Sequence, residues 1–160
     1  MALIGYTNAG KSTLFNRLTG AGVLSRDMLF ATLAPPMRAV SLPSGRQIVL
    51  ADTVGFISQL PTELVEAFKS TLEEVVQADL LLHVHDAASP LVAEEADDVR
   101  GVLADLGIDE DQQAARCLSV MNKSDLLDAG DPVREALVNL FDEGCFTSAM
   151  DGDGIDGLLA

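Results

Sequence analysis

Residues 5–12 read GYTNAGKS, a complete G-x-x-x-x-G-K-[ST] phosphate-binding loop. A short apolar run, residues 2–4, precedes the loop, and the helix-like sequence KSTLFNRL follows from Lys11. In a strand, loop and helix so arranged, backbone N–H groups and the positive helix end face one point, where phosphate oxygens bind. Lys11 supplies a cation for the β- and γ-phosphates, and the Ser12 hydroxyl is placed to ligate Mg²⁺. The stretch therefore predicts a nucleoside triphosphate site on a P-loop NTPase fold.

A second motif, NKSD at residues 122–125, follows the apolar run 117–121 and indicates the base. A carboxylate at a strand end can accept two parallel hydrogen bonds from the N1–H and the exocyclic amine of guanine, a donor pair that adenine lacks. Because buried polar groups left unpaired cost about 1–3 kcal/mol each, we assign Asp125 as the guanine reader. We expect Asn122 to tie this loop to the phosphate loop and the Lys123 stem to lie over the base. An ATPase is the alternative that Asp125 disfavours.

Two further segments complete a series of four sequence motifs. Residues 52–55 read DTVG after the strand-like run 47–51, so that Asp52 can hold a water of the Mg²⁺ shell and Gly55 leaves its N–H free to approach the γ-phosphate. Residues 147–149 read TSA, where a small residue lets a backbone N–H reach the guanine O6. The order and spacing of the four elements resemble the GTPase motif series of the translation-factor class.

Longer stretches of sequence make the resemblance specific to one family of GTPases. They are GYTNAGKSTLFN, FATL, DTVGFI, LPTELVEAFKSTLEEV and ADLLLHV. They are similar to the G domain of HflX, a ribosome-associated GTPase of the Obg-HflX group, over essentially the whole chain. The resemblance implies that Thr32 in FATL is the first-switch threonine that closes on Mg²⁺ when the γ-phosphate is present. The family usually continues DPTTR, whereas residues 34–38 here read APPMR, which puts in doubt any family role for the missing side chains but not that of Thr32.

The expected site residues lie on the phosphate loop, the first switch, the DTVG segment and the two base-reading loops. Catalytic roles are expected for Lys11, Thr32 and Gly55, and metal contacts for Ser12, Thr32 and, through water, Asp52. The expected GTP-binding residues are Gly5, Tyr6, Thr7, Asn8, Ala9, Gly10, Lys11, Ser12, Thr13, Phe30, Ala31, Thr32, Leu33, Ala34, Asp52, Thr53, Val54, Gly55, Asn122, Lys123, Ser124, Asp125, Ser148, Ala149 and Met150.

Phe56 stands where the best-known small GTPases carry a water-aligning glutamine after the D-x-x-G glycine. A phenyl ring can neither donate nor accept, so slow hydrolysis is expected of the domain alone. Asn8 occupies the place where related GxxNAGKS proteins ligate K⁺, an ion that could replace an arginine finger; the alternative is that Asn8 only stabilises the loop. The other source of stimulation that the resemblance implies is the large ribosomal subunit.

Periodicity predicts one α/β domain with a mostly parallel six-stranded sheet and helices on both faces. Its expected helices span residues 11–18, from 62 past 75, 91–106 and 132–141; its expected strands include 37–42, 47–52 and 80–86. Cys117 and Cys145 are expected to be buried thiols of a cytosolic protein, and His83 and His85 to be packed imidazoles without a catalytic role. We expect a domain excised from a longer protein, covering residues 1–160 with its last helix truncated.

The net charge of −15, with only three lysines, argues against direct binding of DNA or RNA by these residues. Three explanations stay open for a ribosomal partner: a salt-adapted organism, contact with basic ribosomal proteins, or RNA binding by segments outside this sequence. We expect a cytoplasmic, monomeric G domain without a membrane span. Two functional classes remain: a GTPase whose output is ribosome-stimulated hydrolysis, and an Obg-like nucleotide-gated binding switch that hydrolysis merely resets.

Overall fold

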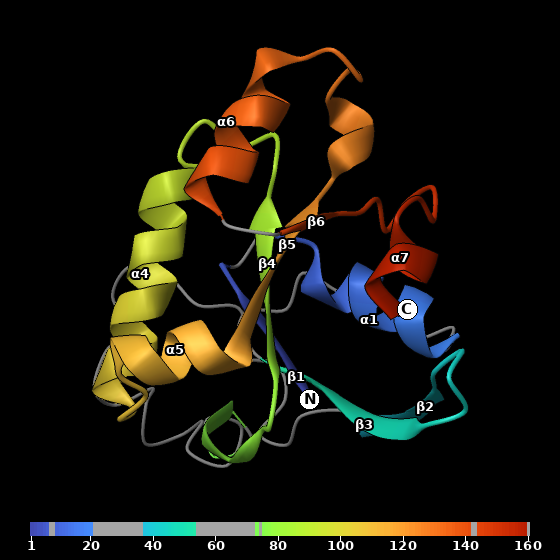
Figure 1. Cartoon of the computed structure of the whole chain (residues 1–160), viewed down its shortest axis with the longest axis vertical. Coiled ribbons are helices and arrows are strands. Elements are labelled where there is room, and N and C mark those ends of the chain that lie inside the picture. Colours follow the sequence, from blue (N-terminus) through green and yellow to red (C-terminus); the bar gives the residue numbers. More distant parts are fainter. Residues whose placement is uncertain (7–8, 21–36, 54–72, 74, 142–143, 160) are drawn as a thin grey trace.

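One six-stranded sheet organises the chain. The computed structural model describes residues 1–6, 9–20, 37–53, 73, 75–141 and 144–159. Within them the strand order is β2-β3-β1-β4-β5-β6 (Figure 1). β2 and β3 pair antiparallel, and every other neighbouring pair of this sheet is parallel, which confirms the expected mostly parallel sheet. The strands are β1 (Ala2–Gly5), β2 (Met37–Ser41), β3 (Gln47–Asp52), β4 (Leu81–Asp86), β5 (Cys117–Asn122) and β6 (Cys145–Phe146).

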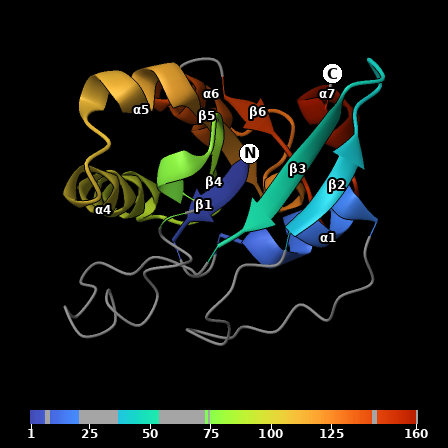
Figure 2. The ribbon, with the colours of Figure 1, turned by 90° about the horizontal axis from the view of Figure 1, so that it is seen from below.

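Helices cover both faces of the sheet, as expected. In Figure 1, α4, α5 and α6 lie on one side and α1 and α7 on the other, and Figure 2 shows the two layers from below. The expected helices and strands inside the described residues end within one residue of the observed ones. The helices are α1 (Lys11–Thr19), α4 (Val92–Asp105), α5 (Glu110–Arg116), α6 (Pro132–Leu140) and α7 (Ile155–Leu159), with a 3₁₀ turn η1 (Ser124–Leu126).

Alternation along the central strands divides the core between the two faces. On β1, Ile4 packs with Val99 and other residues of the α4 face, whereas Leu3 packs with Leu14 of α1. All four residues of β1 are buried, because parallel strands covered on both sides leave no polar face. The sheet is thus fixed rigidly at its centre, and the carboxyl ends of its parallel strands meet at one edge.

Helix α5 was not predicted, because it buries no residue and therefore lacks an apolar stripe. A capping box at its N-terminus stabilises α5 instead. The Asp109 side chain accepts from the Gln112 N–H at 2.9 Å, and the Gln112 side chain accepts from the Asp109 N–H at 3.2 Å. The helix predicted from residue 62 lies mostly outside the described residues, and Val75 near its end is buried in the core. No described helix is both long and apolar enough to pass through a membrane.

The two histidines of β4 are core residues. His83 and His85 are 4% and 3% exposed, and the His85 ring stacks on Phe141 with ring centroids 4.0 Å apart. Burial, with a smaller effect of Arg100, lowers the pKa of His85 to about 3, so this imidazole is neutral at ordinary pH. Neither His83 nor His85 belongs to the group of predicted site residues at the edge of the sheet.

Candidate functional site

The phosphate loop leaves β1 at a point of very close packing. A Cβ on Gly5 would lie 2.5 Å from the Val84 carbonyl oxygen of the neighbouring strand, so only glycine fits. Gly10, with φ +87°, ends the loop and precedes Lys11, the first residue of α1. The N-cap residue Gly10 has no side chain, and no described side chain caps this end of α1.

Lys11 and Asp52 are two buried charged residues, the first at the start of α1 and the second at the end of β3. They are 6% and 7% exposed, and burial lowers the pKa of Lys11 and raises that of Asp52, each shift being partly offset by the other charge. The Ser12 hydroxyl donates to Asp52 Oδ2 at 3.0 Å. Among the described residues, Asp52 Oδ1 is buried without a hydrogen-bond partner. A hydroxyl and an unpaired carboxylate oxygen side by side are hard oxygen ligands that fit a hydrated Mg²⁺.

Thr53 fixes the start of the DTVG segment. Its hydroxyl donates to the Leu3 carbonyl oxygen of β1 at 2.6 Å and is buried. The segment therefore leaves β3 directly beside the strand that delivers the phosphate loop, because β1 and β3 are parallel neighbours. Its following residues, Val54 and Gly55, lie outside the described residues.

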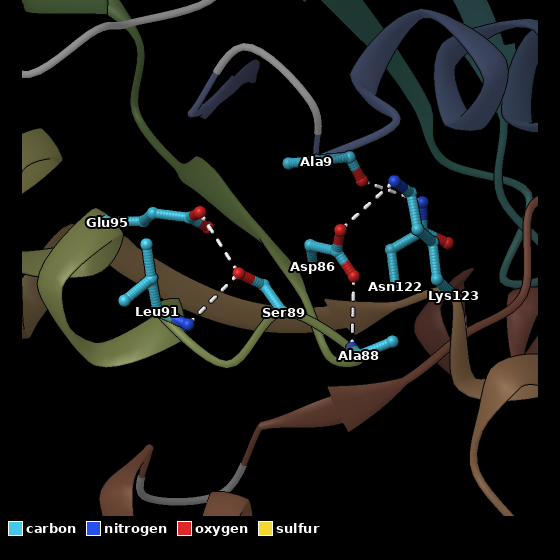
Figure 3. A network of polar contacts seen from close by, with 8 residues as sticks. All are labelled: Ala9, Asp86, Ala88, Ser89, Leu91, Glu95, Asn122 and Lys123. Atoms are coloured by element: carbon cyan, nitrogen blue, oxygen red, sulfur yellow. Dashed lines mark hydrogen bonds and ion pairs between the residues drawn. The ribbon is translucent and has the colours of Figure 1, made fainter.

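Asn122 joins three loops from a buried position at the end of β5. Its Nδ2 donates to the Ala9 carbonyl oxygen of the phosphate loop at 3.0 Å (Figure 3). Its Oδ1 accepts from the Ala149 N–H at 3.1 Å and from the Thr147 hydroxyl at 3.3 Å. A Cβ on Gly10 would lie 2.6 Å from this Nδ2, so the contact requires glycine there as well. Asn122 thus holds the phosphate loop and the base-reading loops in one fixed arrangement.

Lys123 follows in the left-handed conformation, with φ 63°. Its Nζ lies 3.1 Å from Asp86 Oδ2, and Asp86 Oδ1 accepts from the Ala88 N–H at 3.0 Å (Figure 3). A Cβ on Gly10 would lie 3.8 Å from Lys123 Cε, so the lysine stem runs beside the phosphate loop. Sequence reasoning missed Asp86, because a single Asp at the end of a strand carries no signal of its ion pair.

The carboxylate assigned to guanine lies on η1. Asp125 is exposed, and its Oδ1 accepts from the Ser148 hydroxyl at 2.8 Å. The Ser148 hydroxyl in turn accepts from the Asp151 N–H at 3.1 Å. Asp125 is therefore oriented by the neighbouring loop and still open to a ligand.

The loop after β6 is anchored on both sides. The Thr147 N–H donates to the Met121 carbonyl oxygen at 2.8 Å, and the Ser124 N–H donates to the Thr147 carbonyl oxygen at 3.0 Å. From α1, the Arg17 guanidinium donates to the Ala149 and Met150 carbonyl oxygens at 3.0 and 2.6 Å. Arg17 is a second residue that the motifs did not indicate.

The structure gathers sixteen of the predicted residues at this edge and leaves the others undescribed. Gathered are Gly5, Tyr6, Ala9, Gly10, Lys11, Ser12, Thr13, Asp52, Thr53, Asn122, Lys123, Ser124, Asp125, Ser148, Ala149 and Met150. Outside the described residues lie Thr7, Asn8, Phe30, Ala31, Thr32, Leu33, Ala34, Val54, Gly55 and also Phe56.

Comparison with known proteins gives a consistent picture. The family model described as "50S ribosome-binding GTPase" matches residues 1–123. The GTPase HflX of Magnetococcus marinus is 52% identical over 160 residues, which is all of this chain and 36% of that protein. The GTPase HflX of Escherichia coli is 47% identical over 159 residues, 99% of this chain and again 36% of that protein. The chain thus spans about a third of the length of these relatives.

A solved structure agrees with the fold. The crystal structure of a GTP-binding protein from the hyperthermophilic archaeon Sulfolobus solfataricus in complex with GDP superimposes with a TM-score of 0.70 at 30% identity. The match covers 98% of this chain and 49% of that one. The six-stranded sheet with helices on both faces is therefore a fold that also occurs in a nucleotide-bound protein.

Proposed function

This chain belongs to the family of 50S ribosome-binding GTPases, as a G domain of the HflX kind, and we propose that it binds GTP and GDP and hydrolyses GTP with Mg²⁺. The observation that carries the proposal is the Asn122 amide. It connects the carbonyl of Ala9 on the phosphate loop to the N–H of Ala149 beside the guanine reader. One side chain thus sets the spacing between a polyphosphate site and a base site.

At the phosphate end, Lys11 meets the β- and γ-phosphates. Burial opposes its charge in the absence of a ligand, and an approaching phosphate would restore the stabilising environment of the ammonium. Ser12 and, through water, Asp52 would hold Mg²⁺, with Thr32 completing the set by resemblance. When bound, Mg²⁺ neutralises charge on the β- and γ-phosphate oxygens. Asp52 Oδ1, a buried oxygen to which no described residue donates a hydrogen bond, is the atom that supports this role.

At the base end, the proposal assigns Asp125 to the N1–H and the exocyclic amine of guanine. Ser148 donates to Asp125 Oδ1 and so fixes the plane of the carboxylate before a base arrives. The Lys123 stem, held at its tip by Asp86, provides an apolar surface for one face of the purine. A backbone N–H of the loop that contains Ser148, Ala149 and Met150 would meet the guanine O6.

Hydrolysis is proposed to be slow in the isolated domain. Thr32 and Gly55 carry the switch roles by resemblance, and Phe56 offers no group to orient the attacking water. An arginine at the γ-phosphate typically contributes a factor of about 10³–10⁵ in rate, so its substitute must come from elsewhere. We propose K⁺ bound through Asn8 and a ribosomal partner as the two sources.

The large ribosomal subunit is proposed as the partner, and this partner would place the protein in the cytoplasm. The support is the family description and the name of the relatives, together with a net charge of −15 that disfavours RNA contact by these residues alone. We therefore propose that segments outside this sequence make the RNA contacts of a domain excised from a longer protein. Phe56 also favours the second function, a nucleotide-gated switch in which hydrolysis only resets the bound state.

Titration of the full chain with GDP, GTP and ATP tests the binding proposal, with Mg²⁺ present and then chelated. Binding of both guanine nucleotides, with ATP unable to compete, is the expected result. Equal competition by ATP would refute the role of Asp125. Hydrolysis by the longer protein that contains this domain, measured with and without purified 50S subunits, tests the partner, and a flat response would leave only the switch function. A non-hydrolysable GTP analogue that supported the full biological effect would select the switch over the enzyme.

A further inference from the structure

Arg17 connects α1 to the loop after β6. Its Nε donates to the Ala149 carbonyl oxygen at 3.0 Å and its Nη2 to the Met150 carbonyl oxygen at 2.6 Å. The two acceptors are consecutive in the chain and are 132 and 133 residues from Arg17 in sequence. The planar guanidinium is suited to two acceptors in a fixed spacing, so this is a clamp on one short segment of backbone.

Other contacts hold the same segment from the opposite side. The Ala149 N–H donates to the buried Asn122 Oδ1 at 3.1 Å, and the Gly152 N–H donates to the Ser148 carbonyl oxygen at 2.8 Å, which closes the turn. A trans peptide points its C=O and N–H in opposite directions. Because Arg17 holds the Ala149 carbonyl, the N–H of Met150 in the same peptide is turned away from α1.

The helix that carries Arg17 also carries the phosphate-binding residues. Lys11 begins α1, and Arg17 follows six residues later, about 9 Å along the axis at 1.5 Å per residue. Leu14, Phe15 and Leu18 bury the intervening face of the helix against the sheet. The helix is therefore a rigid spacer between the phosphate loop and the segment that the Arg17 clamp holds.

We propose that Arg17 is a positioning residue for guanine recognition: its clamp on the Ala149 and Met150 carbonyls directs the backbone N–H of Met150 toward the guanine O6. The inference rests on the proposed binding of guanine nucleotides at this site. Arg17 does not touch the nucleotide itself. Its removal should weaken the contact to O6 and leave the contact of Asp125 to N1–H and the exocyclic amine in place.

The test compares Arg17→Ala and Arg17→Lys in the full chain with Arg46→Ala, a control at an exposed arginine of the β2–β3 hairpin. Because Arg17 is exposed, solvent partly screens its charge-assisted hydrogen bonds, and we expect about a five- to tenfold loss of GDP affinity in Arg17→Ala, mainly through faster release. Arg17→Lys, with a single ammonium for two carbonyls, should lie between Arg17→Ala and the unchanged protein. Arg46→Ala should bind as the unchanged protein does.

Base analogues separate positioning from a general loss of structure. Inosine diphosphate keeps O6, so Arg17→Ala should weaken its binding by the same factor as that of GDP. In 6-thioguanosine diphosphate a sulfur, a poor acceptor, replaces O6, and the same variant should lose less than about threefold. Equal losses for GDP and the sulfur analogue, or no loss for GDP, would overturn the inference while the proposed function stood. Failure of the unchanged protein to bind GDP would refute the proposed function and the inference with it.

Discussion

Replacement of Asn122 by alanine should lower the stability of the folded protein and weaken nucleotide binding. The side chain is 1% exposed and makes three hydrogen bonds, to the Ala9 carbonyl, the Ala149 N–H and the Thr147 hydroxyl. At about 1 kcal/mol for each bond, with a further penalty for buried groups left unpaired, the free energy of unfolding should fall by about 3–5 kcal/mol. The fall should be present without nucleotide, because all three partners belong to the protein.

Urea denaturation of the nucleotide-free protein measures this change, and Asn139→Ala is the matched control, since Asn139 is exposed on α6. GDP titration of the same variants then measures how much the fixed spacing of the loops contributes to binding. A loss of stability no larger than that of Asn139→Ala would refute the view that Asn122 is the structural link. Lowered stability with unchanged GDP affinity would show that the link is not needed for the site.

Four further predictions concern the base, the buried imidazole, the cation and the switch. Asp125→Asn should lower GDP affinity by about tenfold or more, because an amide cannot accept from both guanine donors; undiminished binding of labelled GDP would contradict the assignment. The unfolding free energy should fall as pH drops from 6.5 toward about 3, because unfolded His85 takes up a proton that the native imidazole, with its pKa lowered to about 3, refuses. The loss should reach up to about 4 kcal/mol near pH 3, and His85→Phe should flatten this part of the stability profile. Exchange of Na⁺ for K⁺ should raise the rate of GTP hydrolysis, and equal rates in the two salts would remove Asn8 from the mechanism. Phe56→Ala should leave GTP affinity nearly unchanged; a large loss in a binding titration would mean that the second switch is misplaced.

Local sequence signals predicted the architecture because each of them depends on near neighbours. A few consecutive residues are enough to recognise the apolar run of β4, the amphipathic spacing of α4 and the glycines of the phosphate loop. Helix α5 was not predicted from the sequence, because a two-residue capping box rather than burial stabilises its helical conformation. Its signal, Asp109 followed three residues later by Gln112, was present but has no apolar pattern beside it.

The sequence motifs predict the residues of the candidate site, but they do not indicate the residues that hold these in place. Lys11, Asn122 and Asp125 stand in motifs that can be recognised from the sequence alone. Arg17 and Asp86 act through partners that are 132 and 37 residues away, and nothing in their own neighbourhood distinguishes them from other surface charges. Such contacts depend on the tertiary structure, because only the folded sheet brings these segments together.

The buried Lys11 and Asp52 have a consequence for how this domain could change over time. Burial lowers the pKa of Lys11 and raises the pKa of Asp52, so the interior of the protein opposes the charge on each side chain. Replacement of buried charged residues by apolar side chains of similar size is often neutral or stabilising for a fold. Selection for thermal stability alone would therefore favour the loss of these two buried charges. Selection for nucleotide binding is what would maintain them.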